Sequence, residues 1–175
     1  MELVDVYNNK RDKLNLVRER KNIGKGEYRL SVHVWIMNDN KIGIQKRDSN
    51  KEIFPNLWEQ SGGEVIAGET SKDAVIRECK EELNINILDS ELIYIGSYLR
   101  IDDIVDIWLL NKNLDKENII LEKGEVSDIK FVTFDEFDKM IEDNKVVPTI
   151  NPSYMLLRNY CETYKMQHEF IIKEN

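Results

Sequence analysis

The sequence predicts a mixed α/β fold built on a mixed β-sheet. Short segments rich in β-branched and aromatic residues outnumber helical ones, and a helical segment stands between two groups of strands. The chain has 175 residues, with no internal repeat, low-complexity tract or Pro/Gly-rich linker, which suits one domain. We therefore expect a single domain with an N-terminal strand or hairpin extension (1–27), a core (28–145) and a C-terminal helix (146–175).

The strands are expected in order along the chain. Residues 1–8 form an outlying strand, and RLSVHVWIM (29–37) alternates as a strand that returns through IGIQKR (42–47) after the turn NDNK. The remaining strands are LWEQS (57–61), which leads into two glycines, the pair LIYIGSYLR (92–100) and IVDIWLL (104–110), and DIKFV (128–132).

Three helices have start signals. Thr70 stands three residues before Asp73, and Thr133 three residues before Glu136, both arrangements of the capping-box type. In TINPSYMLLRNYCETY, Asn151 can cap a helix whose first residue is Pro152.

Composition narrows the possible partners and compartments. A formal charge of -8 argues against broad nucleic-acid binding, which needs a positive face. No apolar run reaches membrane-spanning length and MELVDVYNNK lacks a signal-peptide core, so we expect a cytoplasmic protein. Cys79 and Cys161 match no metal-ligand spacing and are expected to be reduced, buried thiols. Basic residues gather in RERKNIGKGEYR (18–29), as either a solvated hairpin or a ligand-facing one.

The segment SGGEVIAGETSKDAVIRECKEELNI (61–85) places three glutamates close together. On a helix starting after Thr70, Glu78, Glu81 and Glu82 share an arc of about 100°. The adjoining arc is apolar and must face the sheet; it consists of Val75, Ile76, Cys79 and Leu83. The carboxylates therefore border the buried edge of the helix.

Such like charges repel one another along a helix, which a solvated acidic face would tolerate. A hard divalent cation offers a second explanation, because it needs several converging oxygen ligands. Gly62 and Gly63 fit this second explanation, since they permit unusual dihedrals and bring a carbonyl close to a metal or ligand. Gly68 permits the bend into Thr70.

The spacing of these residues resembles the Nudix box, G-x5-E-x7-R-E-U-x-E-E-x-G-U, in which U is a bulky apolar residue. Gly63, Glu69, Arg77-Glu78-Cys79, Glu81-Glu82 and Asn84-Ile85 occupy its positions. Asn84 replaces the usual glycine, but Asn also suits a left-handed helix stop. Cys79 takes a U position as an apolar filler and is not expected to be a nucleophile.

The resemblance implies an α/β/α sandwich with a mixed sheet, and hydrolysis of a nucleoside diphosphate linked to another moiety. It also implies Mg²⁺ or Mn²⁺ as cofactor. By the same resemblance, Glu78 and Glu82 are the principal metal ligands, with Glu81 as a third or water-mediated one. A carbonyl of Gly62 or Gly63 completes the ligands, and Glu69 with Arg77 ties the glycine loop to the helix.

The family places its general base variably. Glu125, shortly before the last strand, is favoured slightly over Glu81, with Glu122 behind them, although Glu125 can equally be a surface residue. Arg47, at the end of its strand, is expected to point toward phosphate, with Lys46 facing away. We expect His33 to be structural and Trp58 to be a core residue.

Two rival functions remain open. QKRDSNKEIFPNLWEQSGGEV also resembles the isopentenyl-diphosphate isomerase branch of the superfamily, whose catalytic cysteine and histidine are missing after Trp58. The other rival is a catalytically silent binding domain, which has no need of a repulsive carboxylate cluster. The expected partner is a small diphosphate, a nucleotide derivative, and a homodimer could use residues 1–8 or IVDIWLL (104–110).

Overall fold

The computed structural model describes residues 2–173, with side chains described through Tyr164. Seven strands form one sheet in the order β5-β4-β3-β8-β7, with β6 paired to β3 and β9 paired to β4. Their bounds are Arg29–Asn38 (β3), Lys41–Arg47 (β4), Trp58–Glu59 (β5), Ser61–Glu64 (β6), Leu92–Leu99 (β7), Asp103–Asn111 (β8) and Val126–Val132 (β9). Because β3 and β8 run parallel while the other pairs are antiparallel, the predicted mixed sheet is confirmed.

The sheet divides between β3 and β4. These strands pair only through Ile36–Asn38, whereas the other part of β3 pairs with β6 through Ser31–Val34. Strand β4 continues instead with β5 and β9. Gln60 is the single residue between β5 and β6, so the chain crosses from the β4 side to the β3 side at that position.

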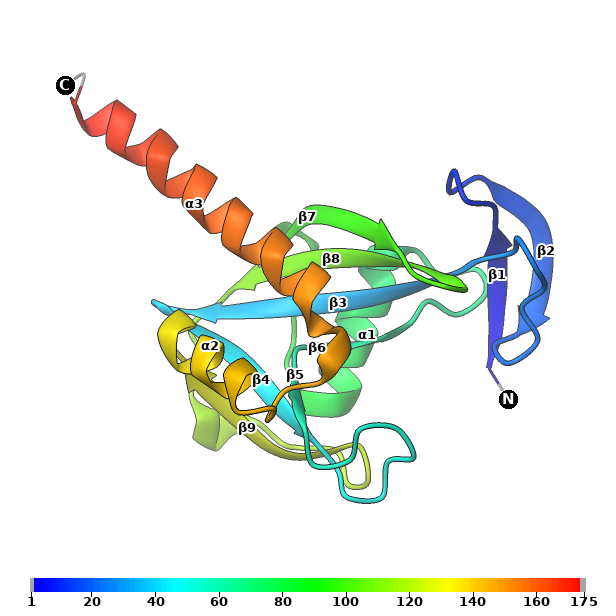
Figure 1. Cartoon of the computed structure of the whole chain (residues 1–175), viewed down its shortest axis with the longest axis horizontal. Coiled ribbons are helices and arrows are strands. Elements are labelled where there is room, and N and C mark those ends of the chain that lie inside the picture. Colours follow the sequence, from blue (N-terminus) through cyan, green and yellow to red (C-terminus); the bar gives the residue numbers. More distant parts are fainter. Residues whose placement is uncertain (1, 174–175) are drawn as a thin grey trace.

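Helices cover both faces of the sheet (Figure 1). Helix α1 (Ser71–Leu83) packs Val75, Cys79 and Leu83 against one core, which includes Val32 and Val34 of β3. On the opposite face, α2 (Phe134–Glu142) and α3 (Asn151–Lys173) enclose a second core around Trp35. The alternation of β3 supplies both cores, because successive side chains point to opposite faces. The predicted sandwich is confirmed.

Two of the helix starts are as predicted. Thr70 and Asp73 form a capping box at α1, and Thr133 and Glu136 form one at α2. Helix α1 ends at Asn84 in the left-handed conformation (φ 55°, ψ 31°), as its place in the motif requires.

The C-terminal helix α3 begins within one residue of its predicted start, but the prediction that Asn151 caps it is wrong. Asn151 has helical dihedrals (φ -51°, ψ -47°) and lies inside a helical run that begins with the 3₁₀ turn Pro148–Ile150. Pro148 therefore takes the first helical position, where its fixed φ and missing N–H are tolerated. Short 3₁₀ turns also occur at Asp89–Glu91 and Lys116–Asn118.

The N-terminal extension is a hairpin of β1 (Leu3–Tyr7) and β2 (Lys13–Glu19), set apart from the main sheet (Figure 1). Strand β1 buries Val4 and Val6, while β2 is exposed along most of its length. The backbone of Tyr7 exchanges two hydrogen bonds with that of Tyr28, which joins the hairpin to the start of β3.

The suggestion that IVDIWLL could serve a dimer is wrong for that segment. Strand β8 lies between β3 and β7, and its residues from Asp103 to Leu110 are buried. It therefore presents neither an open edge nor a solvent-facing surface. Among residues 2–173, no helix has the length and apolar content needed to cross a membrane.

Candidate active site

An acidic cleft of about 350 Å³ opens beside α1, where β6, the end of β4 and the loop before β9 meet. Its charged lining residues are Glu2, Arg20, Arg47, Lys51, Glu59, Glu64, Arg77, Glu78, Glu81, Glu82, Glu122 and Glu125, and Gly62 and Gly63 complete one wall. The structure thus brings together the residues selected from the sequence, with Glu69 directly behind them as a partner of Arg77.

Gly62 and Gly63 do not have the unusual dihedrals that were expected. They lie in strand β6 opposite His33 and Val32, and neither is among the positive-φ glycines of residues 2–173. The reason for glycine is close approach. A Cβ on Gly62 would lie 2.2 Å from the carbonyl oxygen of Val32, and one on Gly63 would lie 2.1 Å from Oε1 of Glu78. Gly68, with φ +87°, does provide the predicted bend.

Arg77 connects the loop after β6 to helix α1, as expected. Its Nε lies 2.9 Å from Oε1 of Glu69, and its Nη2 donates to the backbone carbonyl of Glu64 at 2.7 Å. Glu69 in turn accepts from the backbone N–H of Ile66. The ion pair therefore holds both ends of the loop against the helix.

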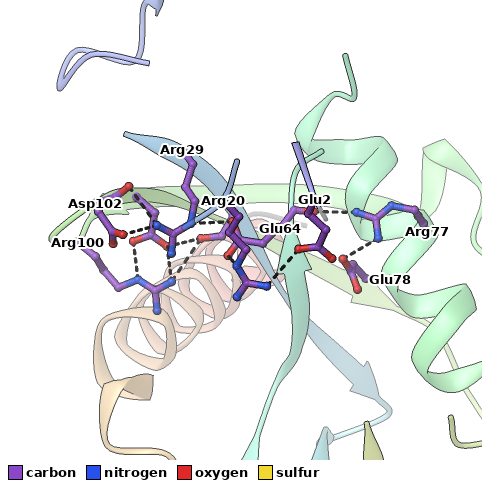
Figure 2. Close-up of polar contacts among 10 residues, drawn as sticks. Glu2, Arg20, Arg29, Glu64, Arg77, Glu78, Arg100 and Asp102 are labelled. Atoms are coloured by element: carbon purple, nitrogen blue, oxygen red, sulfur yellow. Dashed lines mark hydrogen bonds and ion pairs between the residues drawn. The ribbon is translucent and has the colours of Figure 1, made fainter. Parts of the chain in front are cut away.

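Arg77 also holds two of the three clustered glutamates. Its Nη1 donates to Oε1 of Glu78 at 2.7 Å and to Oε2 of Glu81 at 3.1 Å. Glu78 is the more buried of the two, with 14% of its side chain exposed against 53% for Glu81. Burial raises the pKa of Glu78, although the neighbouring Arg77 opposes this. Figure 2 shows the Arg77–Glu78 contact at one end of a row of charged side chains.

Glu82 is held differently, by a side chain from the sheet. Nε2 of Gln45 in β4 donates to Oε2 of Glu82 at 2.9 Å, and the Ser61 hydroxyl donates to Oε1 of Gln45 at 2.6 Å. Gln45 and Ser61 are each 3% exposed. Burial raises the pKa of Glu82 to about 8, with added repulsion from Glu78, Glu59 and Glu125 and partial relief from Gln45. Among the residues whose side chains the structure describes, no cationic group pairs with this carboxyl group.

The donor set fits a hard divalent cation in its chemistry. Partly buried carboxylates with raised pKa values gain most from a positive charge placed among them. The carboxylates do not yet converge on one point, because within residues 2–173 no three His, Cys, Asp or Glu side chains lie close enough to hold a metal ion. Arg77 draws Glu78 and Glu81 toward itself, so ligation requires these side chains to rotate.

Glu125 and Glu122 reach the cleft from the loop before β9. The backbone N–H groups of Ile120 and Glu122 donate to the carbonyls of Leu83 and Glu82, which fixes this loop to the end of α1. The ammonium group of Lys51 pairs with Glu125, whose side chain is 43% exposed. Both candidate bases therefore lie at the rim rather than at the floor.

Arg47 lines the cleft as expected, but its guanidinium is already engaged. Its Nη1 lies 2.6 Å from Oε1 of Glu59, and its Nε donates to the carbonyl of Ile53. Lys46 lines neither this cleft nor the cavity behind it. Glu59 was not selected from the sequence; burial raises its pKa, and Arg47 opposes the increase.

Sequence reasoning also missed Gln45, and it left a ligand-facing role open for the basic segment 18–29 without selecting Arg20. Gln45 could have been found, because it lies two residues before Arg47 and so shares its face of β4. Arg20, which lies 3.3 Å from Oε1 of Glu64, comes from the N-terminal extension, where no local pattern distinguishes it from a solvated residue.

Two other residues lie as expected. Trp58 is buried in the second core. Cys79 is fully buried, and burial raises the pKa of its thiol, which makes it inert as a nucleophile. Cys161 is only partly buried.

Comparisons with known proteins identify the family and the fold. The family model described as NUDIX domain matches residues 27–150. An uncharacterized Nudix hydrolase of Listeria monocytogenes is 34% identical over 151 residues, covering 85% of this chain and 89% of the relative. An isopentenyl-diphosphate Delta-isomerase of Salmonella heidelberg is 33% identical over 67 residues, or 37% of each chain.

Solved structures share the fold. A Deinococcus radiodurans protein superposes with a TM-score of 0.73 at 21% identity, covering 90% of this chain and 98% of that one. A bifunctional NMN adenylyltransferase/ADP ribose pyrophosphatase of Francisella tularensis, complexed with AMP and a manganese ion, gives 0.59 at 21% identity, covering 75% and 41%. Because the sequence identity is only 21% in both cases, these two comparisons show a shared fold alone.

Proposed function

This chain belongs to the Nudix family, and we propose that it hydrolyses the diphosphate bond of a nucleoside diphosphate derivative with Mg²⁺ or Mn²⁺ as cofactor. The observation that carries the proposal is the position of Glu82. A carboxyl group with a raised pKa is held at the cleft by Gln45 and lies among further carboxylates that cannot neutralise it. Burial among other carboxylates destabilises the ionised form of Glu82 unless a cation binds beside it.

Each residue has a proposed role. Glu78 and Glu82 would hold the cation, with Glu81 as a third or water-mediated ligand and a carbonyl of Gly62 or Gly63 completing the set. When bound, the metal neutralises phosphate charge and makes water more acidic. Arg77 and Glu69 position the loop, and Arg47 lies where it can exchange Glu59 for a phosphate oxygen.

The proton from the attacking water goes to a carboxylate at the rim. We place Glu125 first in this role, ahead of Glu81 and Glu122. Lys51 pairs with Glu125 and holds its side chain at the cleft. The manganese ion and AMP bound by the Francisella protein are consistent with this cofactor and substrate class.

A substrate panel tests the proposal. Purified protein is incubated with nucleoside diphosphate derivatives and Mg²⁺ or Mn²⁺, and the release of a nucleoside monophosphate is measured. The Glu82→Gln variant is expected to lose at least about a hundredfold in turnover. The matched control, Glu117→Gln, changes an exposed glutamate outside the cleft and should keep full activity. Full turnover by Glu82→Gln at saturating Mg²⁺ would refute the metal assignment.

Isomerisation of isopentenyl diphosphate is the second candidate, favoured by the partial similarity to the Salmonella isomerase. Its weakness is chemical. The isomerase branch is expected to carry a catalytic cysteine and a histidine after Trp58, but Glu59, Gln60 and Ser61 stand there, and the thiol of Cys79 is buried. Formation of dimethylallyl diphosphate from isopentenyl diphosphate would reverse this ranking.

A further inference from the structure

Strand β6 is held in place mainly through the side chains at its two ends. Its four residues are Ser61–Glu64, and the two in the middle are glycines. In the described part of the chain, β6 pairs with β3 and with no other strand. Glycine adds backbone freedom and has no side chain to pack, so such a strand does not hold its own position. The side chains of Ser61 and Glu64 are therefore the ones that can fix it.

The Ser61 end of β6 is linked to Glu82 through Gln45. The Ser61 hydroxyl donates to Oε1 of Gln45 at 2.6 Å, and Nε2 of Gln45 donates to Oε2 of Glu82 at 2.9 Å. The two ends of a carboxamide differ, because its oxygen accepts while its nitrogen donates. Ser61 occupies the oxygen, and so favours the orientation in which Gln45 presents an N–H group to the Glu82 carboxylate. The opposite orientation would place two oxygen acceptors face to face.

The Glu64 end of β6 is linked to Glu78 through Arg77. Nη2 of Arg77 donates to the backbone carbonyl of Glu64 at 2.7 Å, and Nη1 of the same guanidinium donates to Oε1 of Glu78 at 2.7 Å. The guanidinium group is planar and rigid, so its donors cannot move independently of one another. A displacement of the Glu64 backbone would therefore move Arg77 and, with it, the carboxylate of Glu78.

The side chain of Glu64 fixes this end of β6 from the other side. Its Oε2 lies 2.9 Å from Nε of Arg29 in β3, and its Oε1 lies 3.3 Å from Nε of Arg20 in the N-terminal extension. The Glu64 and Arg29 side chains are only 8% and 12% exposed, and Arg29 also pairs with Asp102. Figure 2 shows Arg29 and Arg77 on opposite sides of Glu64. A buried carboxylate between two arginines keeps its position, because moving away would leave buried charges without counter-charges.

We propose that Ser61 and Glu64 are positioning residues for the metal site, which together fix β6 and thereby hold the two principal proposed metal ligands at a fixed separation. This inference rests on the proposed function, because it concerns the residues that would hold the cation. Neither residue touches the cation or the substrate in this role: Ser61 acts through Gln45, and Glu64 acts through Arg77. Since Arg20 is one partner of Glu64, the N-terminal extension contributes to metal binding from outside the Nudix box.

Binding of Mn²⁺ in the absence of substrate tests the inference without any turnover. Electron paramagnetic resonance measures free Mn²⁺ during a titration of the metal-free protein. Glu64→Leu removes the ion pairs with Arg29 and Arg20 and should weaken Mn²⁺ binding about tenfold or more. Glu64→Gln can still accept from Nε of Arg29 and should restore most of that affinity. The control Glu27→Gln changes a glutamate that pairs with Arg18 outside the cleft, and it should bind Mn²⁺ as wild type does.

Ser61 is tested by a double-mutant cycle with Gln45. Ser61→Ala should weaken Mn²⁺ binding about threefold or more, which corresponds to the loss of one hydrogen bond. In Gln45→Leu protein, Ser61→Ala should have no further effect, because the amide that Ser61 orients is absent. The matched control, Ser97→Ala, changes an exposed serine of β7 and should leave Mn²⁺ binding unchanged. This cycle decides the role of Ser61 even if Glu64→Leu does not fold.

Urea unfolding of each variant separates positioning from an effect on stability alone. A purely structural role would lower the free energy of unfolding and leave the Mn²⁺ affinity of the folded protein unchanged, which would overturn the inference. An equal effect of Ser61→Ala on Mn²⁺ affinity with and without Gln45 would overturn it as well. A wild-type protein that binds Mn²⁺ but hydrolyses no nucleoside diphosphate derivative would refute only the proposed function, whereas one that does not bind Mn²⁺ would refute both.

Discussion

At the scale of single residues, the burial of Glu82 connects protonation with folding stability. The pKa of glutamate is about 4.5 in the unfolded chain and about 8 at Glu82 in the folded protein. Between these values the native state keeps a proton that the unfolded chain releases. In metal-free protein the stabilising effect is therefore complete below pH 4.5 and is lost as the pH rises to 8.

We predict that Glu82→Gln removes this dependence, since glutamine does not ionise and its carbonyl can still accept from Gln45. In EDTA, the variant should lie close to wild type near pH 5 and exceed its free energy of unfolding by about 3–4 kcal/mol near pH 8, because each pKa unit corresponds to about 1.4 kcal/mol. Urea unfolding at both values measures the difference. Glu81→Gln, at a more exposed carboxyl, should show no such divergence. An equal effect of Glu82→Gln at both pH values would contradict the prediction.

The motif spacing predicted which carboxylates share one side of α1, but not how differently they are held. That difference depends on Gln45, which lies 37 residues before Glu82 in sequence and reaches it only because β4 passes beside the helix. The local pattern therefore predicts the cluster, while tertiary contacts determine the environment of each member.

At the scale of elements, strand β6 shows two adjacent glycines kept for different reasons. At Gly62 an added Cβ meets the backbone of β3, which cannot move without breaking the strand pairing. At Gly63 it meets the end of the flexible Glu78 side chain, which can rotate. Gly62 therefore matters for folding stability, whereas Gly63 matters for the position of the Glu78 side chain in the site.

We predict that Gly62→Ala lowers the free energy of unfolding by about 1–3 kcal/mol, the usual cost of overpacking. Gly63→Ala should change it by less than about 1 kcal/mol, yet weaken Mn²⁺ binding about tenfold or more, because Glu78 is displaced. Denaturant unfolding and Mn²⁺ titration by electron paramagnetic resonance measure the two effects. The two alanine variants serve as controls for each other, and indistinguishable behaviour would contradict the assignment.

Elements with strong local signals were predicted well. The capping boxes at Thr70 and Thr133 predicted where α1 and α2 begin. The alternation of residue types along β3 predicted that strand. A hairpin was one of the options for residues 1–27, but the bounds of β2 were not predicted, because its residues are exposed and its pairing with β1 is its main support. The cap of α3 was misassigned because Pro148 and Pro152 both offer a first helical position, and the helical run begins at Pro148.

At the scale of the whole molecule, the N-terminal hairpin is part of the site as well as of the fold. It contributes Glu2 and Arg20 to the acidic cleft. Arg11, in the turn of this hairpin, also pairs with Asp106 of β8. The Asp106 carboxylate is fully buried, and both Nη atoms of Arg11 contact it. No sequence pattern links these two residues, which are 95 positions apart.

This contact yields a prediction about how the hairpin is held to the body. Arg11→Met leaves Asp106 buried without its cation, which should cost about 3–5 kcal/mol of unfolding free energy. Arg18→Met, in an exposed pair with Glu27, should cost less than about 1 kcal/mol. The double variant Arg11→Met/Asp106→Leu should recover most of the loss, because no uncompensated charge remains. Urea unfolding of the four proteins measures these differences, and equal losses for Arg11→Met and Arg18→Met would show that the hairpin is anchored by its apolar contacts instead.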